Sequence, residues 1–556
     1  MRARSARLQL IHLSPPTAIA TPSATPTPSS GPAGTLADVV VVSDLHLGRG
    51  RNPETGRYHP LETFFHDRDM GRFLAWVSGD AVARGRTVKV VFNGDTFDLL
   101  RTEIHPAAEA GTSRREHRFG LDPTPEVVGR QMEAIVAGHP GFIEALSDLA
   151  ASGHEAVFLP GNHDLELQWD AAQAPLVAAF RAVLRQRAVA SPFLDVEAAA
   201  ARISFAPWFV YEPGRLWIEH GCQYDAESAF HHPLRRPLEH RFPEGAAEED
   251  VPMGSFFQRY LYNAFGAVTF LVPSTRANAR YGRWLLLNRP RLLFHVGLSH
   301  LPFIWQLMRR LSRRDGEARL AMAAAHAAEL DRLATQAGLG DDLLAIDAQK
   351  IVLGADLSQA LEDYGRQALR GIGLVSGLIL AAAGLWSSGL LAINELGPDF
   401  GLKTMLFLAL NVAMMFAVGA ATTYLLLRTE PPPSPPTLRS AARTIARRLR
   451  VPVVSFGHTH EEVFMRFERT RDEKSTYVNT GTWVAVFGHD DAVPRERVQM
   501  TFLRVIDLEP ELLYWSPGRG EPMPVILFDE FDELDRFDSG ADSAFTAAPR
   551  HGSPPQ

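Results

Sequence analysis

The chain has 556 residues, which is enough for a large catalytic domain and a substantial addition. A hydrophobic content of 46% and a charged content of 22% are ordinary for a folded protein and exclude wholesale disorder. The net charge of -8 provides no general attraction to nucleic acid, so we expect no nucleic-acid partner. A single cysteine, Cys222, excludes an internal disulfide and a cysteine-based zinc site, and fits a reducing compartment.

Both ends of the chain are predicted to be disordered tails. Residues 1–36 begin with basic residues, but their apolar run is short and Pro15 and Pro16 interrupt it, so the segment makes a poor export signal. The rest of this segment is rich in Pro, Ser, Thr and Ala and cannot bury a core. Residues 528–556 are acidic and then rich in Gly, Ser and Pro.

Five short apolar runs each lead into polar residues that can bind a metal. They lie at 37–48, 88–98, 155–164, 215–221 and 451–460. Helical-looking stretches, for example 69–84 and 126–150, separate the first three runs. This alternation predicts an α/β core with its reactive groups at the carboxyl ends of strands.

Other strands are predicted to complete the sheets. Residues 202–218 read as a hairpin around Glu212-Pro213-Gly214, and further strands are expected at 475–487, 498–508 and 511–515. We therefore assign one catalytic domain to two parts of the chain, 37–230 and 431–527. A helical insertion, either interfacial or packed as an ordinary domain, occupies 231–365.

Residues 366–430 are predicted to form a two-helix transmembrane hairpin. Gly371–Asn394 and Thr404–Leu427 are uncharged stretches of 24 residues, each about 36 Å long as a helix. The alternative is a pair of buried core helices. Two shorter candidates, Tyr260–Thr275 and Leu292–Met308, could also enter the membrane or pack inside the insertion, and the aromatic and basic end of the second favours an interfacial helix.

Arginines flank the predicted hairpin on both outer sides, whereas the loop between its helices carries two acids and one lysine. The positive-inside tendency places both flanks in the cytoplasm. Candidate site residues lie before and after the hairpin and must meet at one site, so the number of crossings between them is even. We expect a protein of the bacterial cytoplasmic (inner) membrane, with its catalytic domain in the cytoplasm and the lipid bilayer as a partner.

The five runs carry motifs that occur in a fixed order. Alone, each has an ordinary explanation as a turn or a surface histidine, but their conjunction at strand ends indicates a metal site. The motifs are Asp44-x-His46, Gly94-Asp95, Gly161-Asn162-His163-Asp164, His220-Gly221 and Gly457-His458-Thr459-His460.

This set resembles the signature of the calcineurin-like metallophosphoesterase superfamily, over about 37–230 and 450–515. The resemblance implies two mixed β-sheets packed face to face with helices outside, and a metal-dependent phosphoric ester hydrolase. It also implies that Asp44, His46 and His460 bind one metal ion. Asn162, His220 and His458 would bind a second ion, and Asp95 would bridge both.

Mixed carboxylate, amide and imidazole ligands suit two divalent ions of Mn, Fe or Zn, of which we expect Mn. Two such ions lower the pKa of a bridging water and hold the phosphoryl oxygens for in-line attack. By resemblance, His163 stabilises or protonates the leaving oxygen, and Asp164 is able to orient its ring. Asn93 and Asp98 are candidates for fixing the orientation of the ligands, and the alternative for both is an ordinary polar residue.

The substrate is expected to be a phosphomonoester, phosphodiester or pyrophosphate that is membrane-associated or lipid-linked. The style of the motifs is nearest to UDP-2,3-diacylglucosamine pyrophosphatases, although many of those have Arg at the position of His163. Tyr224 and Asp225, which follow His220, either line the pocket or pack. Alternatives are a membrane-anchored hydrolase of soluble or cyclic nucleotides and a non-catalytic membrane scaffold. No obligate protein partner is inferred.

Overall fold

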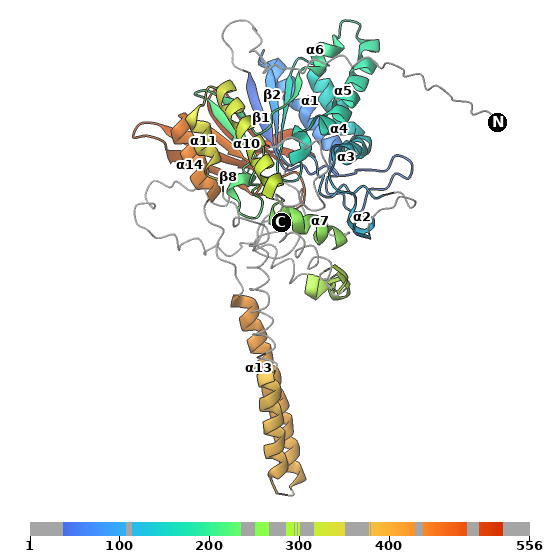
Figure 1. Cartoon of the computed structure of the whole chain (residues 1–556), viewed down its shortest axis with the longest axis vertical. Helices are drawn as coiled ribbons and strands as arrows, with labels where there is room; N and C mark the ends of the chain where they lie inside the picture. Colours follow the sequence, from blue (N-terminus) through green and yellow to red (C-terminus); the bar gives the residue numbers. More distant parts are fainter. Residues whose placement is uncertain are drawn as a thin grey trace, which may run out of the picture. The chain divides into compact units, whose positions relative to one another are not determined.

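Two β-sheets pack face to face at the centre of the chain in a computed structural model, with helices on the outer side of each sheet (Figure 1). The structure describes residues 37–106, 114–234, 251–265, 285–293, 295–296, 298–300, 316–350, 377, 380–397, 399–428, 437–485 and 500–525. The predicted α/β class, with two mixed sheets between helices, is confirmed.

The first sheet has seven strands in the order β12-β11-β10-β1-β2-β3-β4. Its parallel part consists of β1 (Asp38–Val42), β2 (Val88–Asn93), β3 (Glu155–Leu159) and β4 (Ile203–Phe205). Its antiparallel part consists of β10 (Thr501–Ile506), β11 (Glu509–Ser516) and β12 (Glu521–Pro524).

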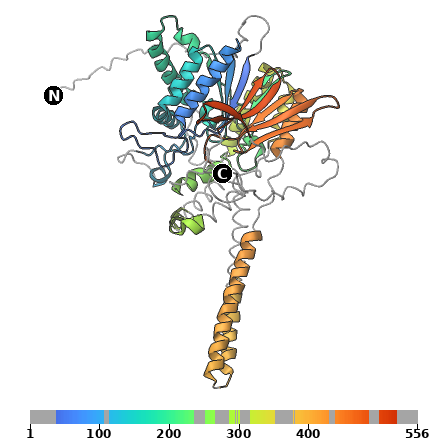
Figure 2. The ribbon, with the colours of Figure 1, turned by 180° about the vertical axis from the view of Figure 1, so that it is seen from behind.

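The second sheet has five strands in the order β5-β6-β7-β9-β8. They are β5 (Phe209–Glu212), β6 (Leu216–Glu219), β7 (Val453–Phe456), β9 (Lys474–Thr480) and β8 (Glu462–Glu468). The strands β6, β7 and β9 are parallel, so the segments before and after the long interval meet directly in this sheet. Figure 2 shows the sheet from behind, with its orange strands beside the blue and red strands of the first sheet.

The valine run of β1 is buried on both faces. Successive side chains of a strand point to opposite faces, so Val39 and Val41 enter the core between the two sheets, whereas Val40 and Val42 enter the core under the helices. A strand covered on both sides reads as a continuous apolar run rather than an alternating one. This explains the DVVVV sequence.

The helices that cover the first sheet come from the segments between its parallel strands. They are α1 (Asp67–Ala83), α3 (Pro125–Gly138), α4 (Pro140–Ala151), α5 (Asp170–Ala190) and α6 (Val196–Ala200). The stretch expected to be helical at 126–150 is divided at His139. Pro140 has no backbone N–H to donate and begins a new helix, for which its fixed φ is well suited.

The helices that cover the second sheet are α10 (Gly316–Gln336), α11 (Asp341–Asp347) and α14 (Thr437–Leu449). Leu330, Leu343 and Ile445 share one buried core with Trp217 and Phe456 of the sheet. The end of the predicted insertion 231–365 therefore supplies an outer layer of the sandwich. The other described helices are α2 (Arg114–Phe119), η1 (Leu165–Gln168), η2 (Cys222–Tyr224), α7 (Met253–Tyr260), η4 (Tyr262–Phe265) and α13 (Phe400–Arg428).

The predicted hairpin at 202–218 is correct only in its second half. β5 and β6 pair antiparallel around the turn at 213–215, but β4 at 203–205 joins the first sheet and runs parallel to β3. The segment thus passes from one sheet to the other, which a local pattern does not reveal. The strands β8 and β12 were not expected from the sequence.

The predicted transmembrane segments lie partly within the described residues. Residues 380–395 are helical, and the indole nitrogen of Trp386 donates to Asn411 Oδ1 of α13 at 3.3 Å. Lys403 Nζ donates to the carbonyl oxygen of Asn394 at 3.0 Å, so the two helices contact each other. Among the described residues, no helix is both long enough and apolar enough to count as a membrane span. The transmembrane hairpin stays a prediction.

Several predictions fall outside the described residues. These are the two tails at 1–36 and 528–556, most of 266–315, and residues 351–376. Most of the two shorter membrane candidates, Tyr260–Thr275 and Leu292–Met308, lies within 266–315.

His139 lies between two carboxylates at the junction of α3 and α4. Its Nδ1 is 3.0 Å from Asp67 Oδ2, and its Nε2 is 3.4 Å from Glu62 Oε2. Glu62 also accepts backbone N–H bonds from Gly50 and Phe64, so it holds the loop that follows β1. Burial lowers the pKa of His139, but the two carboxylates outweigh it and raise the pKa to about 9.

We expect His139→Gln to lower the free energy of unfolding most at pH 6 and progressively less up to pH 10. A histidine whose pKa is raised by folding stabilises the protein fully below its unfolded value, near 6.5, and this contribution is lost as pH rises through about 9. The difference between the variant and the wild type should shrink by up to about 3 kcal/mol over this range. Urea denaturation at several pH values measures it.

His154→Gln is the matched control, because burial lowers rather than raises the pKa of this buried histidine. Its destabilisation should not decrease between pH 7 and pH 10. If the two variants gave parallel curves, the charged network around His139 would not contribute to stability.

Candidate metal centre

The predicted ligands all lie in loops at the carboxyl ends of buried strands. Asp44 follows β1, Asp95 follows β2, Asn162 follows β3, and His220 follows β6 directly. His458 and His460 follow β7. Because these strands are parallel within each sheet and the sheets face each other, the loops meet at one end of the sandwich.

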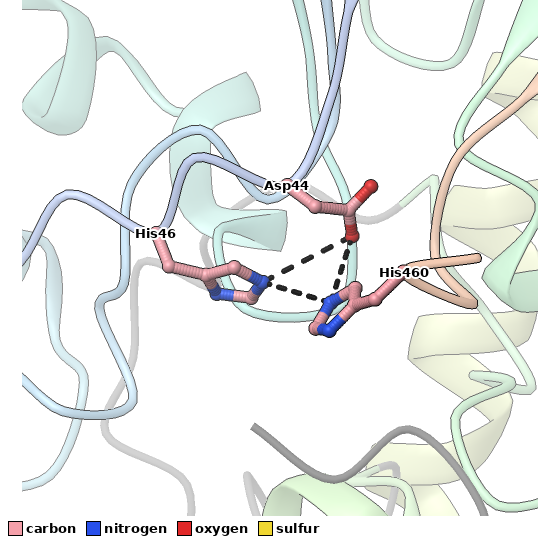
Figure 3. Close-up of side chains that lie close together, drawn as sticks. All are labelled: Asp44, His46 and His460. Carbon is pink, nitrogen blue, oxygen red and sulfur yellow. Dashed lines mark hydrogen bonds and ion pairs between the residues drawn. The ribbon is translucent and has the colours of Figure 1, made fainter. Parts of the chain in front are cut away.

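The described residues contain three groups that could hold a metal ion, and one of them, His46–Asp98–His163, shares His46 with another. We call Asp44, His46 and His460 the first ligand group. Figure 3 shows one carboxylate oxygen and two ring nitrogens directed at the same small space. His460 Nε2 is 3.1 Å from Asp44 Oδ1 and 3.2 Å from His46 Nε2. Ligand atoms about 2.1 Å from one shared ion lie about 3.0 to 3.5 Å apart at octahedral to tetrahedral angles. Two of the three separations fall in this range, and the third, from His46 Nε2 to Asp44 Oδ1, is 3.9 Å.

Asp95, His220 and His458 form the second ligand group. Asp95 Oδ2 is 3.4 Å from His220 Nε2 and 3.8 Å from His46 Nε2, so Asp95 lies between the two groups. Burial raises the pKa of Asp95, but the surrounding histidines, His220 first among them, hold the pKa well below its ordinary value. The carboxylate is therefore ionised and available to cations on either side.

Asn162 is linked to the second ligand group through the next residue in the chain, His163. The backbone N–H of His163 donates to Asp95 Oδ1 at 2.7 Å, which fixes the loop after β3 against the loop after β2. Asn162 itself is buried, and its Oδ1 makes no hydrogen bond within the described part of the chain.

Two more buried ligand atoms, Asp44 Oδ1 and His220 Nε2, make no hydrogen bond with described residues and contact only other ligands, His460 at 3.1 Å and Asp95 at 3.4 Å. A buried polar atom without a partner is costly, typically about 1–3 kcal/mol. A cation in each ligand group would satisfy these atoms. The residues present thus fit the metal ions that the motifs predict, and the buried His and Asp groups could hold them.

The backbone at the ligands is strained. Asp44, His46, Asp95, His458 and His460 have φ between 48° and 72°, in the left-handed region that non-glycine residues seldom adopt. Such strain persists where the surrounding structure imposes it, and it concentrates at functional sites. Here it aims side chains from short loops into one site.

Two glycines of the motifs allow the loops to approach each other. A Cβ built on Gly94, whose φ is +78°, would collide with the ring of His220. A Cβ on Gly161 would lie 2.6 Å from the backbone nitrogen of Asp95. The Gly-Asp and Gly-Asn pairs of the sequence are therefore explained by close approach of backbone to ligand.

His163 is oriented by Asp98 and not by Asp164. Its Nδ1 is 3.0 Å from Asp98 Oδ1, whereas the carboxylate of Asp164 accepts backbone N–H groups of Gly161 and Phe97. Burial lowers the pKa of His163, but the negative charges of Asp98 and Asp95 raise it to about 9. The suggestion that Asp164 orients the ring is thus wrong, because its oxygens are used to shape the loop.

Of the two residues expected to orient ligands, Asp98 contacts a ligand through its side chain, and Asn93 contacts one only through its backbone carbonyl. Asp98 Oδ2 is also 3.5 Å from His46 Nδ1, so one carboxylate contacts a ligand and His163 together. His220 Nδ1 donates to the backbone carbonyl of Asn93 at 2.9 Å, and the side chain of Asn93 donates to the carbonyl of Glu219.

The strand and loop at 478–483 hold the ligand loops in place. Thr482 Oγ1 donates to the carbonyl of Asp44 at 2.6 Å, and Asn479 Nδ2 donates to the carbonyl of Gly457 at 2.5 Å. The Ser43 hydroxyl is 2.6 Å from that of Thr480. These contacts give the segment a structural role beside the ligands.

Two groups next to the ligands were not expected from the sequence. Glu219 is buried and accepts from Trp208, Trp217 and Tyr224, and burial raises its pKa to about 7. Its signal was an acid at the end of an apolar strand. Ser255 of α7 donates to the carbonyl of Asn162 at 3.5 Å, which no pattern indicated.

Asp225 was expected either to line the pocket or to pack. Its Oδ2 is 2.8 Å from His458 Nε2, so it contacts a ligand of the second group. Tyr224, in contrast, packs against Phe456 and donates to Glu219. Of the two expected alternatives, these contacts favour packing for Tyr224.

A scan against protein-family models and a search of curated proteins both find no match to this chain.

Proposed function

We propose that the chain is a metal-dependent phosphoesterase of the calcineurin-like type that uses two divalent ions. The observation that carries the proposal is the pair of adjacent buried ligand groups, Asp44–His46–His460 and Asp95–His220–His458, with Asp95 between them. Two neighbouring sites built from carboxylate and imidazole are typical of hydrolysis at phosphorus, where attacking and leaving oxygens both carry negative charge.

When bound, two divalent ions would supply a water of lowered pKa and neutralise the charge that develops on the phosphoryl oxygens. The residues of the chain would do the rest. Asp95 would hold the two ligand groups in register. His163, held at Nδ1 by Asp98, would donate the proton on Nε2 to the leaving oxygen. A positioned general acid contributes about 10²–10⁴-fold in rate.

We expect the purified chain to release p-nitrophenol from bis(p-nitrophenyl) phosphate when Mn is added. Removal of metal with a chelator should reduce the release to background, and Mn should restore it. The reason is that the proposed reaction depends on metal ions in the two ligand groups. The measurement is the absorbance of p-nitrophenol over time, with metal-free protein as the control. Absence of activity under all three divalent metals, Mn, Fe and Zn, would contradict the proposal.

We further propose that the substrate is membrane-associated or lipid-linked. The support is the pair of helices at 380–395 and α13, on which large apolar side chains are exposed, including Leu380 (72%), Phe400 (83%) and Leu408 (65%). Exposed apolar surface of this kind marks a binding surface for lipid or protein. In this proposal the bilayer covers it and the catalytic domain faces the cytoplasm.

A comparison of acylated and deacylated nucleotide-sugar pyrophosphates tests the lipid part separately. Faster turnover of the acylated compound supports a lipid-linked substrate. Equal turnover favours a hydrolase of soluble nucleotides for which the apolar helices serve only as an anchor.

A further inference from the structure

Asp225 lies on the turn that follows η2, five residues after the ligand His220. Its carboxylate is fixed from three directions. Oδ2 is 2.8 Å from His458 Nε2 and accepts from Ser228 Oγ at 3.1 Å, and Oδ1 accepts from the backbone N–H of Glu227 at 3.1 Å. The side chain of Asp225 is 26% exposed and that of His458 only 6%. A carboxylate held this firmly can dictate the state of the ring beside it.

The contact decides which nitrogen of His458 remains for a metal. An imidazole that donates its Nε2–H to a carboxylate keeps its lone pair on Nδ1. His220 shows the opposite arrangement, since its Nδ1 donates to the carbonyl of Asn93 and Nε2 is left. The two histidines of the second ligand group are thus each given one tautomer by an outer partner, a carboxylate for one and a carbonyl for the other.

The turn that carries Asp225 is braced by helix α7. The backbone N–H of Gly254 donates to the carbonyl of Glu227 at 2.8 Å, and a Cβ on Gly254 would lie 3.2 Å from that oxygen. The next residue, Ser255, donates to the carbonyl of Asn162. One end of α7 therefore contacts both the turn that orients His458 and the loop of a second predicted ligand.

We propose that Asp225 is a positioning residue that fixes the tautomer and ring orientation of His458 and so sets the affinity of the second ligand group for its metal ion. This inference rests on the proposed two-metal function. In the first ligand group the carboxylate beside a histidine is Asp98, 3.5 Å from His46 Nδ1, so Asp225 should influence one ion and leave the other unchanged. Outer partners of metal-binding histidines typically contribute about 10–100-fold in affinity.

The test is a titration of metal-free full-length protein with Mn. Calorimetry measures the affinities, and electron paramagnetic resonance measures how much Mn is bound. The wild type should bind two Mn ions. Asp225→Ala should bind the first ion as before and the second about 10–100-fold more weakly, and its phosphodiesterase activity should return at correspondingly higher Mn. Asp225→Asn keeps an oxygen acceptor for the Nε2–H of His458. Its affinity for the second ion should therefore lie between those of the wild type and Asp225→Ala.

Asp170→Asn is the matched control, since Asp170 is an exposed carboxylate in the first turn of α5. It should bind both ions as the wild type does. Two equal, unweakened sites in Asp225→Ala and Asp225→Asn would overturn the inference while leaving the proposed function intact. A wild type that binds no Mn would overturn the proposed function itself. If Asp225→Ala fails to fold by circular dichroism, Asp225→Asn decides the question.

Discussion

Replacing Asp95 with alanine should reduce Mn-dependent phosphodiester hydrolysis by roughly 10³-fold or more, the scale expected when the charge that holds a catalytic metal pair is removed. Asp95 is 1% exposed and lies between the two ligand groups, 3.4 Å from one histidine and 3.8 Å from another. With alanine, no carboxylate would stand between the metal ions bound at His46 and at His220, and the two ions would repel each other. Steady-state rates with bis(p-nitrophenyl) phosphate measure the loss.

Asp38→Asn is the control for this substitution. Asp38 is equally buried, but it begins β1, at the end of the strand away from Asp44, and pairs with Arg84 at 2.8 Å. Its replacement should lower the melting temperature and leave the turnover number unchanged. Undiminished activity in Asp95→Ala would eliminate the two-metal proposal, whereas an equal loss in both variants would point to damage to the fold.

Gly161→Ala should inactivate the protein nearly as completely, although it adds only one methyl group. The new Cβ would lie 2.6 Å from the backbone nitrogen of Asp95 and closer still to its side chain, so one of the two loops must move. Forcing extra atoms into a packed site costs about 1–3 kcal/mol. The displacement falls on the residue between the ligand groups, so we expect more than about 100-fold loss of activity, on the general ground that small misplacements at a reacting centre are costly.

Gly79→Ala separates this effect from an ordinary glycine replacement. Gly79 lies inside α1, is exposed, and has nothing within 4 Å of a built Cβ. Alanine there should raise stability by about 0.5–1 kcal/mol, because glycine is the poorer helix former, and should not change activity. Wild-type activity in Gly161→Ala would show that the two loops are less tightly coupled than the structure indicates.

The sequence predicted where the site lies because the ligands are attached to strands. A run such as DVVVV must be buried on both faces, and the first polar residues after it must emerge at the edge of the sheet. Asp44, Asp95 and His220 follow this rule directly. The spacing of the motifs along the chain therefore predicted the loops that meet, before any contact between them was known.

Contacts between side chains far apart in the chain could not be predicted in this way. Asp164 is adjacent to His163 in sequence, yet Asp98 orients the ring, because a loop turns neighbouring side chains in different directions. The pair Asp225–His458 joins residues on opposite sides of the long interval, and no local pattern encodes it. The change of sheet between β4 and β5 is likewise a tertiary property.

The pairing of β1 with β10 has a consequence for biosynthesis. Val39 pairs with Val505, so the strand at the centre of the first sheet lacks one neighbour until almost the whole chain exists. At roughly 5–20 residues per second, translation takes tens of seconds to reach β10 after β1 has emerged. Throughout that time an apolar strand edge of the kind that promotes aggregation is open. His458 and His460 also emerge late, so neither of the two proposed ligand groups is complete until most of the chain has been made.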